Sequence, residues 1–116
     1  MIITQDNIIL FKTPPGMYND CPDQATFDSM KSVYDDDMNI VDTKTNLILE
    51  WETADINWFA GQHIEASYPQ WKQSNLVQAG GAELVTMTNF ITAVRAWSNQ
   101  DPIPDPWDGS LESITP

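Results

Sequence analysis

The clearest hydrophobic pattern in the chain lies in residues 84–97, where large apolar side chains recur at steps of three and four residues. At about 100° per residue, this spacing places them on one stripe of an α-helix. The stripe comprises Leu84, Met87, Phe90, Ile91, Val94 and Trp97. Glu83 favours the positive end of the helix dipole, and Pro102 cannot continue a helix. The pattern therefore predicts an amphipathic helix with both ends marked.

A second helix is predicted just before this one. Ser67 and Gln70 have the spacing of a capping box, and Pro69 falls in the first turn, where its missing N–H costs little. Gly80 and Gly81 then provide a break at which the chain reverses. Residues 67–97 are therefore expected to form a helical hairpin.

The N-terminal half alternates short β-prone runs with turn-forming residues. Residues 2–3 and 8–11 flank Gln5-Asp6-Asn7, which is typical of a hairpin or of one interrupted strand. Residues 38–41 and 47–51 flank a five-residue loop, and this pattern predicts a second hairpin. Between them, Asp23 is expected to begin a short helix along which Phe27, Met30 and Tyr34 fall near helical spacing.

A further helix is expected from Thr53, which can cap it. Its buried stripe would comprise Ile56, Phe59, Ala60, His63 and Ile64. These elements together predict an α+β fold in which N-terminal β-hairpins pack against a C-terminal helical hairpin of two to three helices. Residues 1–99 are expected to form this single domain.

The composition changes after residue 99. Residues 100–116 contain four of the eight prolines and several acids, which favours an extended, acidic, proline-rich C-terminal tail. We expect this tail to be ordered only against another subunit or another part of the domain, with Trp107 as its anchor. Its removal is expected to leave the melting temperature nearly unchanged.

The charge balance limits the partners. Seventeen acidic residues against five scattered basic ones give a formal net charge of −12. Binding to nucleic acid needs a basic stripe, and anionic membranes repel such a chain, so neither is an expected partner. A single cysteine, Cys21, excludes an internal disulfide framework. No signal peptide and no run of eighteen apolar residues is found.

No catalytic, cofactor or metal site is predicted. Asp35, Asp37 and Asn39 begin like a calcium-binding loop, but Ile40 stands where that loop needs glycine and Asn46 where it needs glutamate. The segment His63-Ile64-Glu65 resembles the first half of a zinc deaminase signature, but the cysteines of the second half are missing. Cys21 and His63 have no orienting motif around them, so a packed or surface histidine is the favoured interpretation.

The five tryptophans are many for 116 residues, and aromatic residues are enriched both in cores and at interfaces. Trp51, Trp71 and Trp97 fall on apolar faces and are predicted to be core residues. Trp58 lies off the apolar stripe of its helix, and Ile103 and Trp107 lie in the tail. We therefore predict Trp58, Ile103 and Trp107 as partner-binding residues.

Residues 68–98 resemble a segment found in small tail-associated proteins of tailed bacteriophages, of the tail fibre and tail fibre assembly type. The matching residues are Tyr68, Pro69, Lys72, Gln73, Asn75, Met87, Phe90, Ile91, Val94 and Arg95. The resemblance implies a non-enzymatic virion protein, made in the host cytoplasm, that binds other phage structural subunits and its own copies. It leaves open a tail fibre assembly chaperone that leaves before the particle is complete.

A hypothesis of another class starts from the acidity of the chain. A protein with this charge could imitate the phosphate backbone of DNA and occupy a host nucleic-acid enzyme. The acids are spread through loops and termini, whereas such a mimic needs a long two-row array. The phage structural hypothesis is therefore the leading one.

Overall fold

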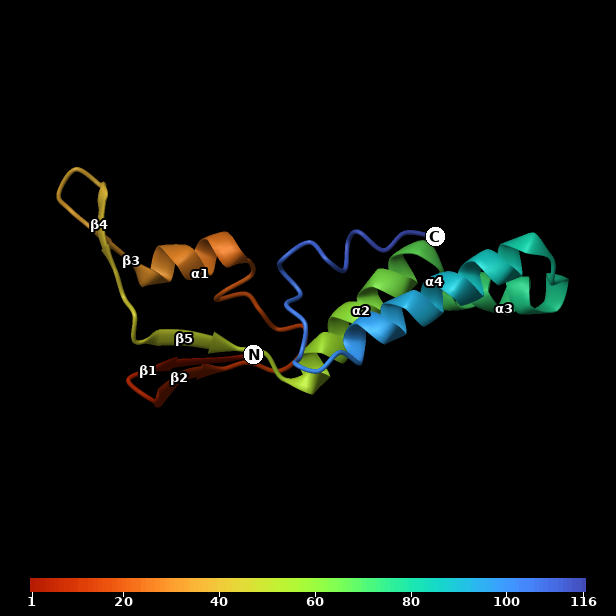
Figure 1. Cartoon of the computed structure of the whole chain (residues 1–116), viewed down its shortest axis with the longest axis horizontal. Helices are drawn as coiled ribbons and strands as arrows, with labels where there is room; N and C mark the ends of the chain where they lie inside the picture. Colours follow the sequence, from red (N-terminus) through yellow and green to blue (C-terminus); the bar gives the residue numbers. More distant parts are fainter. The chain divides into compact units, whose positions relative to one another are not determined.

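The computed structural model describes all 116 residues and contains two compact units, residues 1–52 and residues 53–116 (Figure 1). All five strands and one helix lie in the first unit, and three helices lie in the second. The fold is α+β, as predicted. The boundary between units falls after Glu52, whereas the sequence predicted one after residue 99. The difference arises because the C-terminal segment packs with the helices instead of standing apart.

The first unit contains a three-stranded antiparallel sheet with the order β2-β1-β5. Its strands are β1 (Ile2–Gln5), β2 (Ile8–Lys12) and β5 (Leu47–Glu50). Strands β1 and β2 form the hairpin predicted from their sequence. Asp6 and Asn7 connect them with φ angles of 53° and 66°, the left-handed values that a two-residue type I′ turn requires.

The second predicted hairpin is wrong, because its two strands do not pair with each other. Strand β4 (Ile40–Thr43) pairs with β3 (Ser32–Tyr34), and β5 pairs with β1. Pairing with β1 extends the sheet that buries Leu47. Asn46 fixes the start of β5, because its side-chain amide donates to Asp6 Oδ1 at 2.9 Å and its carbonyl accepts from the Asp6 backbone.

Helix α1 (Gln24–Lys31) begins where the sequence predicted, with Asp23 as its N-cap. The prediction that the helical pattern continues to Tyr34 is wrong, because residues 32–34 form β3. Lys31 marks the change, since its carbonyl accepts a bond from the Lys44 backbone at 2.7 Å and so continues the β3–β4 ladder.

The Asp23 cap leads to a pH-dependent prediction. The hydroxyl and the backbone N–H of Thr26 donate to Asp23 Oδ1 at 2.7 and 2.8 Å, and these bonds hold the pKa of the carboxyl below its ordinary value. Because the folded pKa is lowered, the stabilisation is present above the unfolded pKa and is lost as pH falls through the folded pKa. An NMR titration of the Thr26 amide should therefore have a lower midpoint than Asp23 in the urea-unfolded chain. Equal midpoints would contradict the cap.

The second unit consists of α2 (Thr53–Ser67), α3 (Gln70–Ala79) and α4 (Ala82–Ser98). Helices α2 and α4 lie side by side, and α3 packs against α4 (Figure 1). Gly80 and Gly81 join α3 to α4 with φ angles of 68° and 86°, which glycine adopts at little cost. The predicted helical hairpin is present, with α2 as a third helix.

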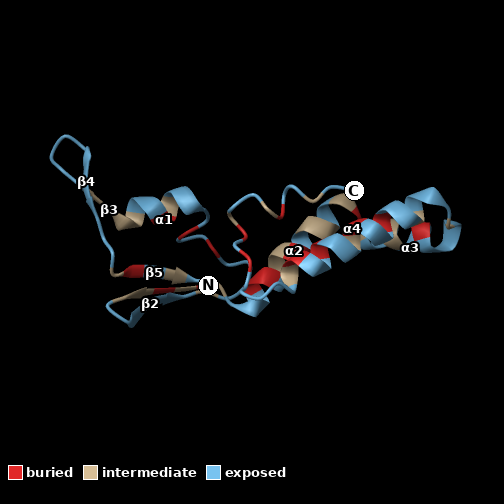
Figure 2. Cartoon of the chain, in the orientation of Figure 1, coloured by how far each residue is buried: buried red, intermediate tan, exposed pale blue.

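The core of this unit lies along the predicted stripe of α4 (Figure 2). The buried residues of α4 are Met87, Phe90, Val94 and Trp97. The Phe90 ring lies 5.5 Å from the His63 ring and 5.6 Å from the Tyr68 ring, measured between centroids. Phe90 thereby joins α4 to α2 and to the α2–α3 connection.

The predicted capping box at Ser67 is wrong. Ser67 is the last residue of α2, and Pro69 is the N-cap of α3, with no side-chain bond of its own. A residue in helical conformation cannot serve as the extended cap of the next helix. The α2–α3 connection is instead held by Gln73, whose side-chain amide donates to the Tyr68 carbonyl at 2.7 Å.

Residues 100–116 form turns that return to the helices of the second unit, and they differ from the extended tail predicted. The Trp97 indole Nε1–H donates to Ser110 Oγ at 2.8 Å, and His63 Nε2 donates to the Ile114 carbonyl at 2.7 Å. Leu111 is buried, whereas Trp107, the predicted anchor, is half-buried. The segment is ordered against its own unit, one of the two situations that the sequence allowed.

Candidate interaction surface

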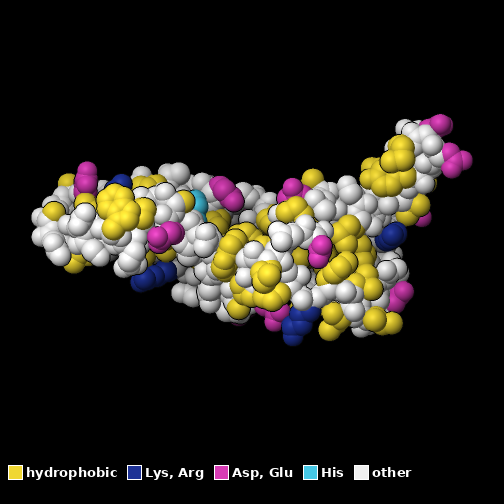
Figure 3. Space-filling model, turned by 180° about the vertical axis from the view of Figure 1, so that it is seen from behind, with side chains coloured by type: hydrophobic (Ala, Val, Ile, Leu, Met, Phe, Trp, Pro, Cys, Tyr) yellow, Lys and Arg dark blue, Asp and Glu magenta, His cyan; other side chains and the backbone are white.

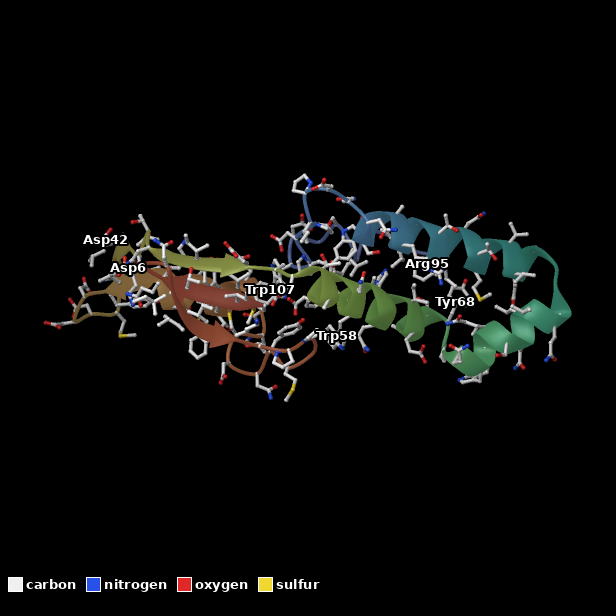
Figure 4. The ribbon with its side chains drawn as sticks, turned by 90° about the horizontal axis from the view of Figure 1, so that it is seen from below. Asp6, Asp42, Trp58, Tyr68, Arg95 and Trp107 are labelled. Carbon is white, nitrogen blue, oxygen red and sulfur yellow. The ribbon has the colours of Figure 1, made fainter.

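The three residues predicted to bind partners all lie in the second unit. Figure 4 labels two of them, Trp58 and Trp107. Trp58 is on α2, is half-buried, and packs edge-on against Phe59 with 5.0 Å between ring centroids. Trp107 is half-buried in a turn in which its backbone N–H donates to Asp105 Oδ1 at 2.8 Å. Ile103 is the most accessible of the three, with 44% of its surface exposed.

Ile103 lies at a shallow hollow of about 290 Å³ between the start of α2 and the end of α4. Its lining consists of Thr53, Ile56, Ser98, Asn99, Gln100, Asp101 and Ile103. Hydroxyls, amides and one carboxylate surround a single exposed isoleucine. Ile56 and Ile103 are the apolar residues of this lining, and Ile103 is the exposed one.

The prediction that Trp71 is a core residue is wrong, because it is 66% exposed. Leu76, five residues further along, is the buried residue of α3. Five residues correspond to about 140° around a helix, so the two side chains point to different sides. Trp71 therefore adds a large aromatic group to the surface of α3.

The groups with possible chemistry are buried or hydrogen-bonded within the chain. Burial raises the pKa of the Cys21 thiol, and the nearby Asp23 carboxylate raises it further, so the thiolate is disfavoured at neutral pH. Asp35 Oδ1 accepts bonds from the backbone N–H groups of Asp37 and Asn39, both at 2.9 Å, and so organises the β3–β4 turn. His63 is bonded to Ile114. Every buried side-chain polar atom has a hydrogen-bond partner.

The strongest surface feature lies in the first unit, where the sequence had predicted no binding residues. Ten of the fourteen large apolar side chains exposed in the chain belong to it. They are Ile8, Ile9, Leu10, Phe11, Met17, Tyr34, Met38, Ile40, Val41 and Ile48. Figure 3 shows hydrophobic side chains over the sheet and the stem of the β3–β4 hairpin, with acidic side chains at the hairpin tip.

Strand β2 is the centre of this exposed surface. Its apolar residues, Ile8 to Phe11, are consecutive and all exposed, and the strand forms one edge of the sheet. An edge strand presents unpaired backbone groups as well as side chains, and is a ready template for pairing. Natural edges are commonly protected by charge or proline, whereas β2 has a single charge, Lys12.

A signal for this surface was present in the sequence. Four consecutive large apolar residues are typical of a strand buried on both faces, and they do not alternate as in a half-buried strand. In the structure this run lies at the edge of a three-stranded sheet, and all four of its side chains are exposed. The run in residues 8–11 could therefore have been interpreted as a contact surface.

Comparisons with protein-family models, curated proteins and solved structures found no match for this chain. No helix of the structure has both the length and the apolar character needed to cross a membrane.

Proposed function

We propose that this protein is a non-enzymatic structural or accessory component of a bacteriophage particle, associated with its tail, which works by binding its own copies and neighbouring subunits. The observation that carries the proposal is the exposed run from Ile8 to Phe11 at the edge of the sheet. Full burial of one such side chain contributes about 1.5–3 kcal/mol. Burial of these four side chains by a partner would therefore contribute a large part of the free energy of binding.

The charge of the chain supports the same proposal. Monomeric soluble proteins seldom expose large contiguous apolar patches, and those that do use them as contact sites. A net charge of −12 keeps single copies apart and soluble before assembly. Because this charge repels other acidic surfaces, stable association requires a partner with apolar surface that fits the exposed strand. Specific contacts are therefore favoured over non-specific association.

The resemblance to tail-associated phage proteins supports the particle as the site of action. The matching residues form α3, α4 and the connection before them, and Met87, Phe90 and Val94 are in the core. Lys72 Nζ lies 5.2 Å from the centroid of the Tyr68 ring, within range for a cation–π contact. The resemblance therefore concerns the residues that hold the helical unit together.

The test is mass spectrometry of purified phage particles from cells that express this chain at its natural level. We expect it in the particle at a fixed ratio to the tail proteins. Presence in lysates together with absence from particles would instead indicate a tail fibre assembly chaperone. If pull-downs recovered only a host nucleic-acid enzyme, and duplex DNA displaced that enzyme, the acidic mimic hypothesis would replace the proposal.

A further inference from the structure

One face of the three-stranded sheet is covered over β1 and β5, where Ile3 and Leu47 are buried, and the other face is open. Residues paired across neighbouring strands lie on the same face. Ile3, which is completely buried, is paired with Phe11 and Leu49 and marks the covered face. The alternating residues form the open face, namely Ile2, Thr4, Ile9, Lys12, Ile48 and Glu50.

One row of residues across the open face is apolar at both ends. Thr4 pairs with Ile9 of β2 on one side and with Ile48 of β5 on the other. The two isoleucines are 57% and 47% exposed. They lie at opposite edges of the sheet, so a second apolar surface placed over this face would contact both of them.

The neighbouring row has opposite charges at its two ends. Ile2 pairs with Lys12 on the β2 side and with Glu50 on the β5 side. Two strand spacings, about 10 Å, separate the two outer positions. The open face therefore has a net charge of zero, with one positive and one negative edge, in a chain whose total charge is −12.

We propose that this open face binds a second copy of the same chain, face to face, about a two-fold axis parallel to the strands. That rotation places β2 of one copy over β5 of the other. Ile9 then contacts the partner's Ile48, and Lys12 faces the partner's Glu50. Each contact occurs twice, because a two-fold interface uses the same surface on both copies. The inference rests on the proposed function and names the surface through which copies associate.

Charge complementarity identifies a second copy as the occupant. Most contacts between two copies would bring acidic residues together, which is unfavourable at short range. The open face avoids this repulsion, because its only charged groups are Lys12 and Glu50 and the rotation pairs each with its opposite. The face thus contains its own complement, a property that an unrelated partner would not require.

The size of the face sets the expected affinity. Three strands of about four residues cover about 200 Å² of sheet, well below the area of a stable interface. We therefore expect a weak dimer, with a Kd of about 10–100 µM. Several copies held in one particle would strengthen the contact through their high local concentration.

The test is sedimentation equilibrium of the full chain, from about 10 to 500 µM in about 0.15 M salt, where charges are screened beyond about 8 Å. Ile9→Lys should raise the Kd about 100-fold, since it places two lysines in the interface. Val85→Lys is the matched control. Val85 is also β-branched and is 59% exposed, close to the 57% of Ile9, but it lies on α4 in the second unit and belongs to no proposed contact surface. It should leave the Kd within about threefold.

A charge exchange tests the orientation of the two copies. Lys12→Glu should raise the Kd about tenfold, because it opposes two pairs of like charges. Adding Glu50→Lys should return the Kd to within about threefold of the wild-type value, because both pairs are complementary again. A variant that merely damaged the sheet would not be rescued. Far-UV circular dichroism checks that each variant keeps its helices.

Three results would overturn the inference. These are a monomeric wild-type chain up to the highest concentration, equal weakening by Val85→Lys and Ile9→Lys, and no rescue by the double exchange. Equal weakening would indicate that the dimer does not form through this face. The particle experiment is independent of all three. A chain that is found in particles but has no dimer through this face rejects only the present inference, and a dimer absent from particles rejects only the proposed function.

Discussion

Trp97→Ala should lower the free energy of unfolding of the helical unit by about 3–5 kcal/mol, whereas Trp71→Ala should change it by less than about 0.5 kcal/mol. The Trp97 side chain is 3% exposed, and its indole N–H is bonded to Ser110. Truncation leaves a cavity in the core and removes the donor to that hydroxyl. Trp71 is on the surface of α3, so its removal leaves no cavity.

The two variants form a matched pair, because each removes the same number of atoms from a helix of the same unit. Urea unfolding followed by far-UV circular dichroism measures both. The midpoint for Trp97→Ala should fall well below that of the wild type, with Trp71→Ala close to it. Similar losses for the two variants would mean that Trp71 is packed in solution and that the placement of α3 is wrong.

Deletion of residues 100–116 should lower the melting temperature of the helical unit by about 10 °C or more. The segment contributes the buried Leu111 and the bonds of Ser110 to Trp97 and of Ile114 to His63. Loss of a buried leucine alone costs about 2–5 kcal/mol, and 1 kcal/mol corresponds to about 4–8 °C in a unit of this size. Differential scanning calorimetry of the full and shortened chains measures the change.

Two point variants test whether the effect of the deletion on the melting temperature comes from the packing of Leu111. Leu111→Ala should lower the melting temperature by a large part of the effect of the deletion. Ile103→Ala, in the same segment but exposed, should leave it nearly unchanged. If the shortened chain melted at the temperature of the full chain, the segment would contribute no net stability. The expectation from its composition would then be correct and the contacts of Leu111 would be of no energetic importance.

The helices could be predicted from the sequence because the information for a helix is local. The steps of three residues from Met87 to Phe90 and of four from Phe90 to Val94 specify both a helix and the side that it buries, without reference to any other element. The break at Gly80 and Gly81 is equally local, since it depends on the conformations available to glycine. The Ser67 cap was wrong because a serine two residues before a proline fits the end of one helix as well as the start of the next.

Strand partners could not be predicted, because backbone hydrogen bonds between strands are the same for any pair of sequences. Residues 40–43 and 47–50 are near neighbours in the chain, which favoured a hairpin between them. Strand β5 pairs instead with β1, more than forty residues away, and buries Leu47 in that sheet. This choice is made by the packing of the whole unit.

The features of the candidate surface also fall into two groups, those that depend on local sequence and those that depend on tertiary structure. The sequence by itself determined the charge of −12, the apolar run in residues 8–11 and the helical segments, since each follows from residue type and local spacing. Only the tertiary structure decided that this run lies at an edge of its sheet, that Ile9 and Ile48 share an open face, and that Trp97 is buried while Trp71 is exposed. Exposure depends on which elements cover a residue, and the neighbours that cover it come from distant parts of the chain.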